Sequence, residues 1–331
     1  MAQVVYGIGS SHSPQLRIGA PDGWLARGES DKRNQGLIGI DGVVSGYDDL
    51  LERRDDLAQV KKEIAPDVML KRHEQNQRSI QKLSENLYKA NPDIIVMIGD
   101  DQQEYLRDDN MPGICLYWGD DVLVKGRTEA GTGQGPMIGY FDEDKRVPTS
   151  SSLGRHMIEF LVESEYDVAR SSFLDPEKNR LGGGIGHAFG YVYHRLMNRE
   201  VIPVVPVMIN TYYPPNQPTP KRCYELGRAI RNAVESWPEK KRVAVIASGG
   251  LSHFVVDEPL DYMAMDGIKN KDIVKLSALP RERMNSGNSE IRNWIIATGA
   301  TEHLDLQYLD YVPCYRSEAG TGCAMAFSEW S

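Results

Sequence analysis

The sequence predicts an α/β fold with a mostly parallel or mixed central sheet and helices on both of its faces. Short apolar runs bounded by turn residues alternate with longer segments in which apolar residues recur at helical spacing. The apolar runs lack the polar alternation of half-exposed strands, which is typical of strands buried on both faces of a sheet. No repeat or low-complexity linker divides the 331 residues, so we expect one domain over residues 1–331.

Four apolar runs are the predicted strands. They are VVYGIG near the start, DIIVMIG ending at Gly99, VIPVVPVMI from Val201 and VAVIAS from Val243. Two intervening segments are predicted helices, because apolar residues share one face of each. These residues are Ile80, Leu83 and Leu87 in MLKRHEQNQRSIQKLSENLYKA, and Cys223, Leu226, Ile230 and Val234 in KRCYELGRAIRNAVESW.

Two regions fit this alternation poorly. Residues 17–68 are charged and loop-like, and we expect them to form an inserted arm or cover laid over the sheet edge. Residues 255–290 resemble a lid or a long connection. Long connections within compact domains are often functional, so both regions are candidates to border a site.

Composition narrows the class of partner. The net charge of -9 and the pI near 5.4 give no basic footprint for nucleic acid or an anionic membrane, and they favour small-molecule partners. The four cysteines form no C-x-x-C pair and are expected to be reduced thiols. The sequence has no long apolar run and no export signal pattern, so we expect a cytoplasmic protein without a membrane segment.

Polar side chains follow the predicted strands at the points where these strands end. His12 follows the first strand and His253 the last, and His187 lies in the glycine-rich stretch LGGGIGHAFG, whose flexible backbone suggests close approach to a ligand. The strand ending at Gly99 is followed by Asp100, Asp101, Gln102 and Glu104. Taken singly, such residues are more often structural, but the carboxyl ends of the strands deliver them to one rim, where α/β sheets bind ligands.

The stretch GIGSSH after the first strand comes close to the dinucleotide fingerprint G-x-G-x-x-G, with His12 in place of the third glycine. Pro14 interrupts a helix that would start at Gly9, which argues against a dinucleotide site. We expect Gly7 and Gly9 instead to let the backbone turn tightly at the rim. The cluster GTGQG from Gly131 is expected to form turns.

Serines flank two of these histidines, which raises the alternative of a serine hydrolase. Neighbours in sequence usually point apart, and the chain contains no G-x-S-x-G elbow, so this alternative is disfavoured. The serines are Ser10, Ser11, Ser13 and Ser252.

Several stretches are similar to those of the class III extradiol ring-cleaving dioxygenases, the superfamily of the protocatechuate 4,5-dioxygenase catalytic subunit and of gallate and 3-O-methylgallate dioxygenases. They are GIGSSHSP, IIVMIGDD, the loop ending in Gly186 and His187, TYYPPNQPTPKRCYELGRAIRNAVESWPE, VAVIASGGLSHF and SGNSEIRNWIIATGA. These stretches cover most of the chain outside residues 17–68. The long run followed by GGLSH is the most specific, because its order and spacing resemble the family.

The resemblance implies a non-haem Fe(II) held by two histidines and one glutamate, with open positions for substrate and O2. Matched by motif, His12 is the first histidine ligand and Glu290, four residues before Trp294 in SEIRNW, is the glutamate. His187 matches the family's acid/base histidine, and His253 matches a second histidine of the pocket. Imidazole suits proton transfer to and from a catechol near neutral pH.

One departure from the family pattern concerns the second histidine ligand. Where the family has Asn-Asp-His, this chain has Asp100, Asp101 and Gln102, so Gln102 stands in the place of the histidine. An amide oxygen is a neutral and weaker donor than imidazole. Three interpretations stay open: Gln102 ligates the metal, Asp101 or Glu104 supplies a charged donor, or no metal binds. We expect a working metal site with Gln102 or a neighbour as ligand.

The implied activity is O2-dependent ring cleavage of a catechol- or gallate-type phenolic acid. The resemblance also leads us to expect a homodimer in which residues 17–68 cover the site, so that no separate small subunit is required. Candidates to orient a ring carboxylate are Tyr212, Tyr213, Arg222 and Ser252. Two other classes stay open: a metal-dependent hydrolase that uses Asp100, Asp101, Glu104 and Glu290 around a metal-bound water, and a non-catalytic member of the superfamily.

Overall fold

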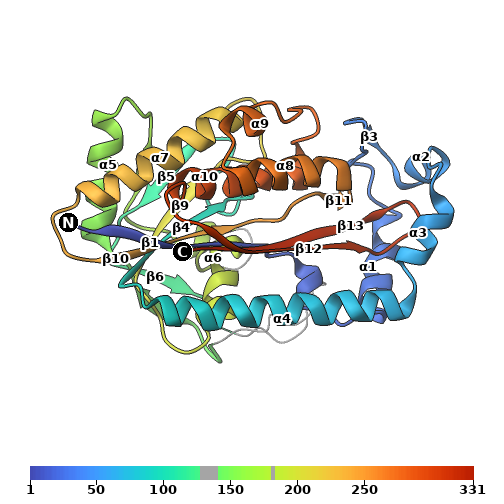
Figure 1. Ribbon diagram of the computed structural model, residues 1–331, viewed down its shortest axis with the longest axis horizontal. Helices are drawn as coiled ribbons and strands as arrows, with labels where there is room; N and C mark the ends of the chain where they lie inside the picture. The colour runs from blue at the N-terminus through green and yellow to red at the C-terminus, as the bar shows by residue number, and fades with distance from the viewer. Residues whose placement is uncertain (127–140, 180–182) are drawn as a thin grey trace.

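A computed structural model describes residues 1–126, 141–179 and 183–331. Within these ranges the central sheet has nine strands in the order β11-β13-β1-β10-β4-β9-β5-β8, with β12 paired to β13 (Figure 1). The strands are β1 (Gln3–Ser10), β4 (Ile94–Asp100), β5 (Ile114–Tyr117), β8 (Ala169–Ser171), β9 (Val204–Ile209), β10 (Arg242–Ser248), β11 (His253–Val255), β12 (Leu306–Tyr315) and β13 (Thr321–Trp330). Two-stranded ribbons pair β2 (Leu37–Ile38) with β3 (Val44–Ser45), and β6 (Asp121–Val124) with β7 (Lys145–Pro148).

The four predicted strands form the parallel centre of this sheet, which confirms the predicted fold class. β1 runs parallel to β10, β10 to β4, and β4 to β9. Ser10 lies opposite Ser248 in this register, so the carboxyl ends of β1 and β10 meet at one edge. The C-terminal hairpin of β12 and β13 adds antiparallel strands beside β1, and it makes the sheet mixed.

Helices cover both faces of the sheet (Figure 1). One face carries α5 (Ser151–Glu163), α7 (Pro220–Ser236), α8 (Glu258–Asn270), α9 (Ile273–Ser277) and α10 (Ile291–Ala300). The other carries α4 (Pro66–Ala90), α6 (His187–Tyr191) and the π-helical turn η3 (Val192–Leu196). Both predicted helices are confirmed as α4 and α7, and α7 begins where Thr219 accepts a hydrogen bond from the backbone of Arg222.

The region 17–68 contains helices rather than the loops expected from its charge. These are α1 (Asp22–Asp31), α2 (Tyr47–Glu52) and α3 (Leu57–Glu63), which together with β2 and β3 lie beyond one end of the sheet (Figure 1). Leu37, Tyr47 and Leu50 form an apolar cluster with Val255 of β11 and with Ala319. These residues of the segment therefore pack against edge strand β11 and the turn between β12 and β13.

The region 255–290 is likewise a helical layer rather than an open lid. Helices α8 and α9 lie within it, followed by the 3-10 turn η4 (Ser286–Glu290). Leu260, Ala264 and Ile268 of α8 are buried in the same core as α7 and α10. Polar residues lie between these buried positions, so the helical spacing of the apolar residues is weak in the sequence.

The structure corrects the expected role of the two glycines in GIGSSH. Both lie inside β1, where a Cβ atom on Gly7 would come 2.5 Å from Thr301, and one on Gly9 would come 2.3 Å from the ring of Trp294. Gly7 and Gly9 therefore permit close packing of the sheet against α10 and its C-terminal end, and they make no turn. The cluster GTGQG from Gly131 lies outside the described residues.

The four cysteines are all buried free thiols, as expected from their spacing. No helix in the described ranges is long and apolar enough to cross a membrane.

Candidate metal centre

Five residues singled out in the sequence meet at the carboxyl edge of the parallel strands. His12 and Gln102 each lie two residues beyond their strands, β1 and β4. His253 is the first residue of β11, and His187 is the first residue of α6. Glu290 ends η4 and immediately precedes α10. Separate elements thus deliver one carboxylate, three imidazoles and one amide to a common place.

The Glu290 carboxylate is the hub of this cluster. Its Oε2 lies 3.5 Å from Nε2 of His12 and accepts a 2.5 Å hydrogen bond from the backbone of Gly250. Its Oε1 accepts a 3.1 Å hydrogen bond from Gln102 and lies 3.2 Å from Nε2 of His253. Burial opposes ionisation of this side chain, which is 1% exposed. His253 and His12 nevertheless hold the pKa of Glu290 well below its usual range, so the carboxylate is charged.

His12 presents a lone pair to that carboxylate. Ser248 Oγ donates its only hydrogen to the carbonyl of Ala188 at 2.6 Å, so it accepts a hydrogen bond from Nδ1 of His12 at 3.1 Å. With the proton on Nδ1, Nε2 is the unprotonated nitrogen that faces Glu290. Burial lowers the pKa of His12 to about 4, which keeps the ring neutral at pH 7. Two lone pairs facing each other at 3.5 Å are an arrangement that a cation stabilises.

His187 is held by a buried carboxylate. Glu104 accepts hydrogen bonds from the backbone nitrogen of His187 at 2.9 Å and from its Nδ1 at 3.1 Å. Gly186 allows this contact, because a Cβ atom there would lie 2.5 Å from Oε2 of Glu104. Burial lowers the pKa of His187, but the charge and hydrogen bonds of Glu104 raise it to about 10. The ring stands edge-on to His12, with centroids 4.8 Å apart.

His253 is a hydrogen-bond donor through both ring nitrogens. Its Nδ1 lies 2.8 Å from the carbonyl of Leu251, and its Nε2 lies 3.2 Å from the Glu290 carboxylate. Both partners are acceptors, so this geometry fits an imidazolium. Burial lowers the pKa of His253, and the Glu290 charge overrides it and raises the pKa to about 9. His253 therefore places a positive charge beside Glu290.

Asp100, the last residue of β4, and Asp101, which follows it, make different contacts. Asp101 accepts hydrogen bonds from the backbone nitrogens of Glu104, Tyr105 and Leu106, so it closes the turn. The Asp100 side chain is completely buried. Its Oδ1 accepts a 3.3 Å hydrogen bond from the Asn293 amide. Burial and the nearby charge of Glu290 raise the pKa of Asp100 to about 7.

A possible metal-binding group contains Asp100 as well as two of the predicted histidines. One ligand atom each from His12, Asp100 and His187 lie within 4.8 Å of one another. Oδ2 of Asp100 is buried and has no hydrogen-bond partner among the described residues. The sequence reading weighed Asp100 only as part of an acidic rim, and it missed Asn293 and Ser248. Asn293 lies one helical turn after Glu290, which is the signal that was available.

The residues expected to orient a ring carboxylate and the serines of the hydrolase alternative do not gather in one place. Tyr212 is half-buried, and its hydroxyl lies 3.1 Å from Ser286 in the turn before Glu290. Arg222 stacks on Tyr166 with 3.8 Å to the ring centroid, an arrangement that ties it to another part of the surface. Ser252 donates a hydrogen bond to Asp261 at 2.6 Å. The serines Ser10, Ser13 and Ser252 bond to Tyr191, Cys323 and Asp261 respectively, and no bond from them to a histidine is found in the described ranges.

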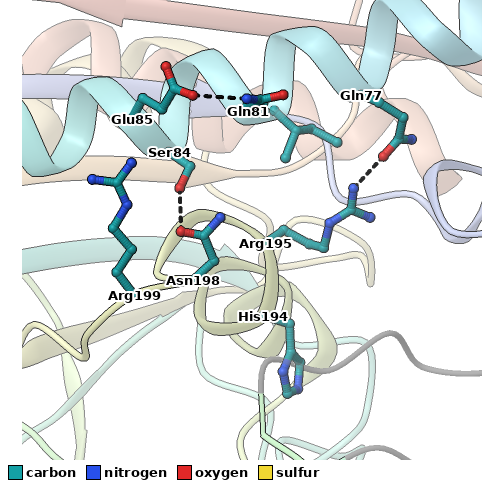
Figure 2. Close-up of a pocket in the computed structure, with 9 residues that line it drawn as sticks. Gln77, Gln81, Ser84, Glu85, His194, Arg195, Asn198 and Arg199 are labelled. Atoms are coloured by element: carbon teal, nitrogen blue, oxygen red, sulfur yellow. Dashed lines mark hydrogen bonds between the residues drawn. The ribbon is translucent and has the colours of Figure 1, made fainter.

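A hollow of about 470 Å³ lies elsewhere, between α4 and η3 (Figure 2). Its walls include Gln77, which accepts a hydrogen bond from Arg195, and Ser84, which donates to Asn198. None of the five residues of the metal centre lines it. Its polar side chains largely bind one another, so the metal centre is the better candidate for chemistry.

A family model matches most of this chain. The model of the catalytic LigB subunit of aromatic ring-opening dioxygenase matches residues 65–313, most of the chain, and the chain belongs to this family. The match includes Gln102, His187, His253 and Glu290, and it begins after His12.

Curated relatives are dioxygenases. The chain is 34% identical over 111 residues to the gallate dioxygenase of Pseudomonas putida, covering 33% of this chain and 30% of that protein. It is 28% identical over 184 residues to the 2,3-dihydroxyphenylpropionate/2,3-dihydroxicinnamic acid 1,2-dioxygenase of Photorhabdus laumondii. This match covers 55% of this chain and 49% of that protein. The enzyme of that name from Mycolicibacterium smegmatis is 28% identical over 173 residues, which cover 52% of this chain and 46% of that protein. The matched segment spans less than half the length of each relative.

Proposed function

We propose that this protein is a non-haem Fe(II)-dependent extradiol dioxygenase that opens the ring of a catechol- or gallate-type phenolic acid with O2. The observation that carries the proposal is the pairing of His12 and Glu290. A neutral imidazole and an ionised carboxylate face each other through lone pairs at 3.5 Å, buried at the carboxyl edge of the sheet. Membership of a ring-opening dioxygenase family supports it, as do relatives named as dioxygenases of gallate and of 2,3-dihydroxyphenylpropionate.

The donor set fits a first-row divalent metal. His12 and Glu290 would hold it, and Gln102 stands beside them where the family has its second histidine. When bound, Fe(II) would offer neighbouring positions to a deprotonated catechol and to O2 and let charge pass from ring to oxygen. Ser248 fixes the tautomer of His12 from behind, as the outer partners of metal-binding histidines do.

The other histidines would handle protons. Glu104 holds the Nδ1 hydrogen of His187 and raises the pKa of its ring to about 10, so Nε2 also carries a hydrogen and is the atom that gives a proton to the substrate and later takes one back. His253 donates to Glu290 and keeps positive charge beside an anionic substrate. Tyr212, whose hydroxyl lies beside the turn that carries Glu290, is the best placed of the sequence candidates to bind a ring carboxylate.

The reaction balances without a further reductant. One ring carbon–carbon bond next to a hydroxyl-bearing carbon breaks, and both atoms of O2 enter the product. The ring is oxidised while O2 is reduced. The product is a muconic semialdehyde type of acid, or a lactone when a methoxy group leaves. We further propose that the arm of residues 17–68 covers the site in a homodimer, so that no separate small subunit is needed.

The decisive experiment is O2 uptake by protein purified without air and loaded with Fe(II). A panel of catechols, gallate and 3-O-methylgallate should include one substrate that consumes one O2 per ring, and 18O2 should place two labelled atoms in the product. Glu290→Gln should abolish uptake, while Glu239→Gln, an exposed change of the same kind, should not. Inert protein after loading would refute the proposal, and turnover without O2 would favour the metal-dependent hydrolase.

A further inference from the structure

The ligand set of the metal centre lacks an identified third protein donor, because the family's second histidine is absent. We propose that the carboxylate of Asp100, and not the amide of Gln102, is this donor. The inference rests on the proposed function only in requiring that His12 and Glu290 bind a divalent metal. It assigns to the metal a residue that occupies no ligand position in the family pattern.

Of the four polar residues that the sequence singled out at the end of β4 and just beyond it, two are already fully engaged. Asp101 receives three backbone N–H groups, and moving it into the site would leave those donors unsatisfied. Glu104 receives the backbone and ring hydrogens of His187. Both of the charged substitutes that the sequence suggested are therefore committed to holding the turn and His187.

Gln102 meets the centre as a donor. Its Nε2 donates a hydrogen bond to Oε1 of Glu290 at 3.1 Å, which leaves the amide oxygen, a neutral and weaker donor than a carboxylate, as the atom that could face a metal. The same oxygen of Glu290 also faces His253. Gln102 is thus a positioning residue, which orients the Glu290 carboxylate so that its other oxygen faces His12.

Asp100 has the properties that Gln102 lacks. It is the last residue of β4, where it pairs with Ile209 of β9, so its backbone is fixed by the sheet. Its side chain is fully buried, and its Oδ2 is without a hydrogen-bond partner in the ranges that the structure describes. A ligand atom of Asp100 lies within 4.8 Å of one from His12 and one from His187. A buried carboxylate with an unused oxygen beside a neutral imidazole is satisfied by a cation.

A neighbouring amide also orients the Asp100 carboxylate, as outer hydrogen bonds usually orient the side chains that bind metals. Asn293 donates to Oδ1 at 3.3 Å and to the carbonyl of Ser248 at 3.0 Å, so one amide links β4 to β10. Such outer hydrogen bonds fix the direction of a coordinating carboxylate. Asn293 and Glu290 lie three residues apart at the start of α10, so this helix sets both carboxylates.

The test is Fe(II) binding measured by anaerobic calorimetry and metal content, with Mn(II) as a second probe. Wild-type protein should bind one ion per chain, and Asp100→Asn should bind at least on the order of 100-fold more weakly, because it loses a charged donor at unchanged volume. Gln102→Ala should stay within about tenfold of wild type. Asp108→Asn, the same chemical change at an exposed position, should leave binding unchanged.

Two further measurements separate ligation from folding. Metal-free Asp100→Asn should melt no lower than metal-free wild type, because it removes an uncompensated buried carboxylate. Asp100→Glu should still bind Co(II), with a visible absorption band shifted from that of wild type, whereas Asp108→Asn should give the wild-type band.

The outcomes distinguish this inference from the proposed function. Binding by Asp100→Asn within threefold of wild type overturns the assignment of Asp100, as does a loss in Gln102→Ala as large as that in Asp100→Asn; the proposed function survives both. Wild-type protein that binds neither Fe(II) nor Mn(II) overturns the proposed function itself.

Discussion

Two buried polar clusters in this protein differ in how far they satisfy themselves. The first, which we name the arm latch, joins Asp31 of α1 to Arg316, with Gln15 and Cys323 around them. Arg316 donates to both oxygens of Asp31 at 2.7 and 3.0 Å and to Gln15 at 3.0 Å. With a longer bond from Arg316 to Cys323 at 3.5 Å, each nitrogen of the guanidinium thus meets an acceptor, and the charges cancel.

The metal centre has the opposite character. Its carboxylates, Glu290 and Asp100, lie close enough for each charge to affect the other, and His12 turns a lone pair toward Glu290. Oδ2 of Asp100 and Oδ1 of Asn293 lack partners among the described residues. Because folding normally satisfies buried polar groups, the contrast indicates that the latch is structural, and it supports the proposal that the metal centre binds a cation.

Breaking the latch should give the largest effect. Arg316→Met leaves Asp31 buried without its counter-charge and should lower the free energy of unfolding by about 3–5 kcal/mol. Urea denaturation measures this loss. The control is Arg53→Met, which breaks an exposed pair with Asp41 and should cost about 1 kcal/mol or less. Equal losses in the two variants would show that burial of the latch contributes nothing.

Filling the metal centre should give the next largest effect, with the opposite sign. Fe(II) at a hundred times its dissociation constant should raise the free energy of unfolding by about 2.7 kcal/mol, because it binds only the folded chain. Anaerobic thermal melts with and without a chelator measure the gain. Glu290→Gln should lose it, while Arg316→Lys should keep it in whatever fraction folds. A gain that persists in Glu290→Gln would place the metal elsewhere.

The parallel centre of the sheet was predictable because strands buried on both faces read as continuous apolar runs. The C-terminal hairpin was not predicted, although all ten residues of β13 are buried. Its sequence TGCAMAFSEW mixes small and polar residues, and its pairing with β1 joins segments some 320 residues apart. Nonlocal pairing of this kind leaves no local period to read.

The site residues likewise fall into some that the sequence predicts and some that it does not. The rule that strand ends converge, together with the family resemblance, was enough to select His12, His187, His253 and Glu290. It did not separate Asp100, Asp101 and Gln102, because successive residues at a strand end point in different directions. Only the backbone turn that engages Asp101 and the Asn293 amide that meets Asp100 distinguish them, and both depend on tertiary packing.

Removing the charge that orients His187 should affect catalysis more than stability. Glu104→Gln keeps the shape of the side chain and removes the charge that orients His187, so we expect kcat to fall about 10- to 100-fold with little change in KM. Steady-state O2 uptake measures both constants. Glu177→Gln, an exposed change on the loop before His187, is the matched control. A rise in KM at constant kcat would mean that Glu104 serves substrate binding instead.

Asp261 extends the comparison to a third buried carboxylate, which accepts hydrogen bonds but forms no ion pair within the part of the chain that the structure describes. It accepts from the backbone and hydroxyl of Ser252 and from Tyr311, and burial raises its pKa to about 7. The folded chain therefore retains a proton between pH 4 and 7 that the unfolded chain releases. Stability should fall as pH rises through this window and level off above it, at most about 1.4 kcal/mol per pH unit.

Asp261→Asn cannot titrate, so its stability relative to wild type should improve as pH rises from 4 to 7. Urea denaturation at each pH measures this difference, and Asp266→Asn, on the exposed side of α8, should show no such trend. A difference between wild type and Asp261→Asn that stays constant with pH would mean that the three donors satisfy the ionised carboxylate. Asp261 would then belong with the self-satisfied latch, and the unpartnered oxygen of Asp100 would be what distinguishes a metal ligand from a buried acid.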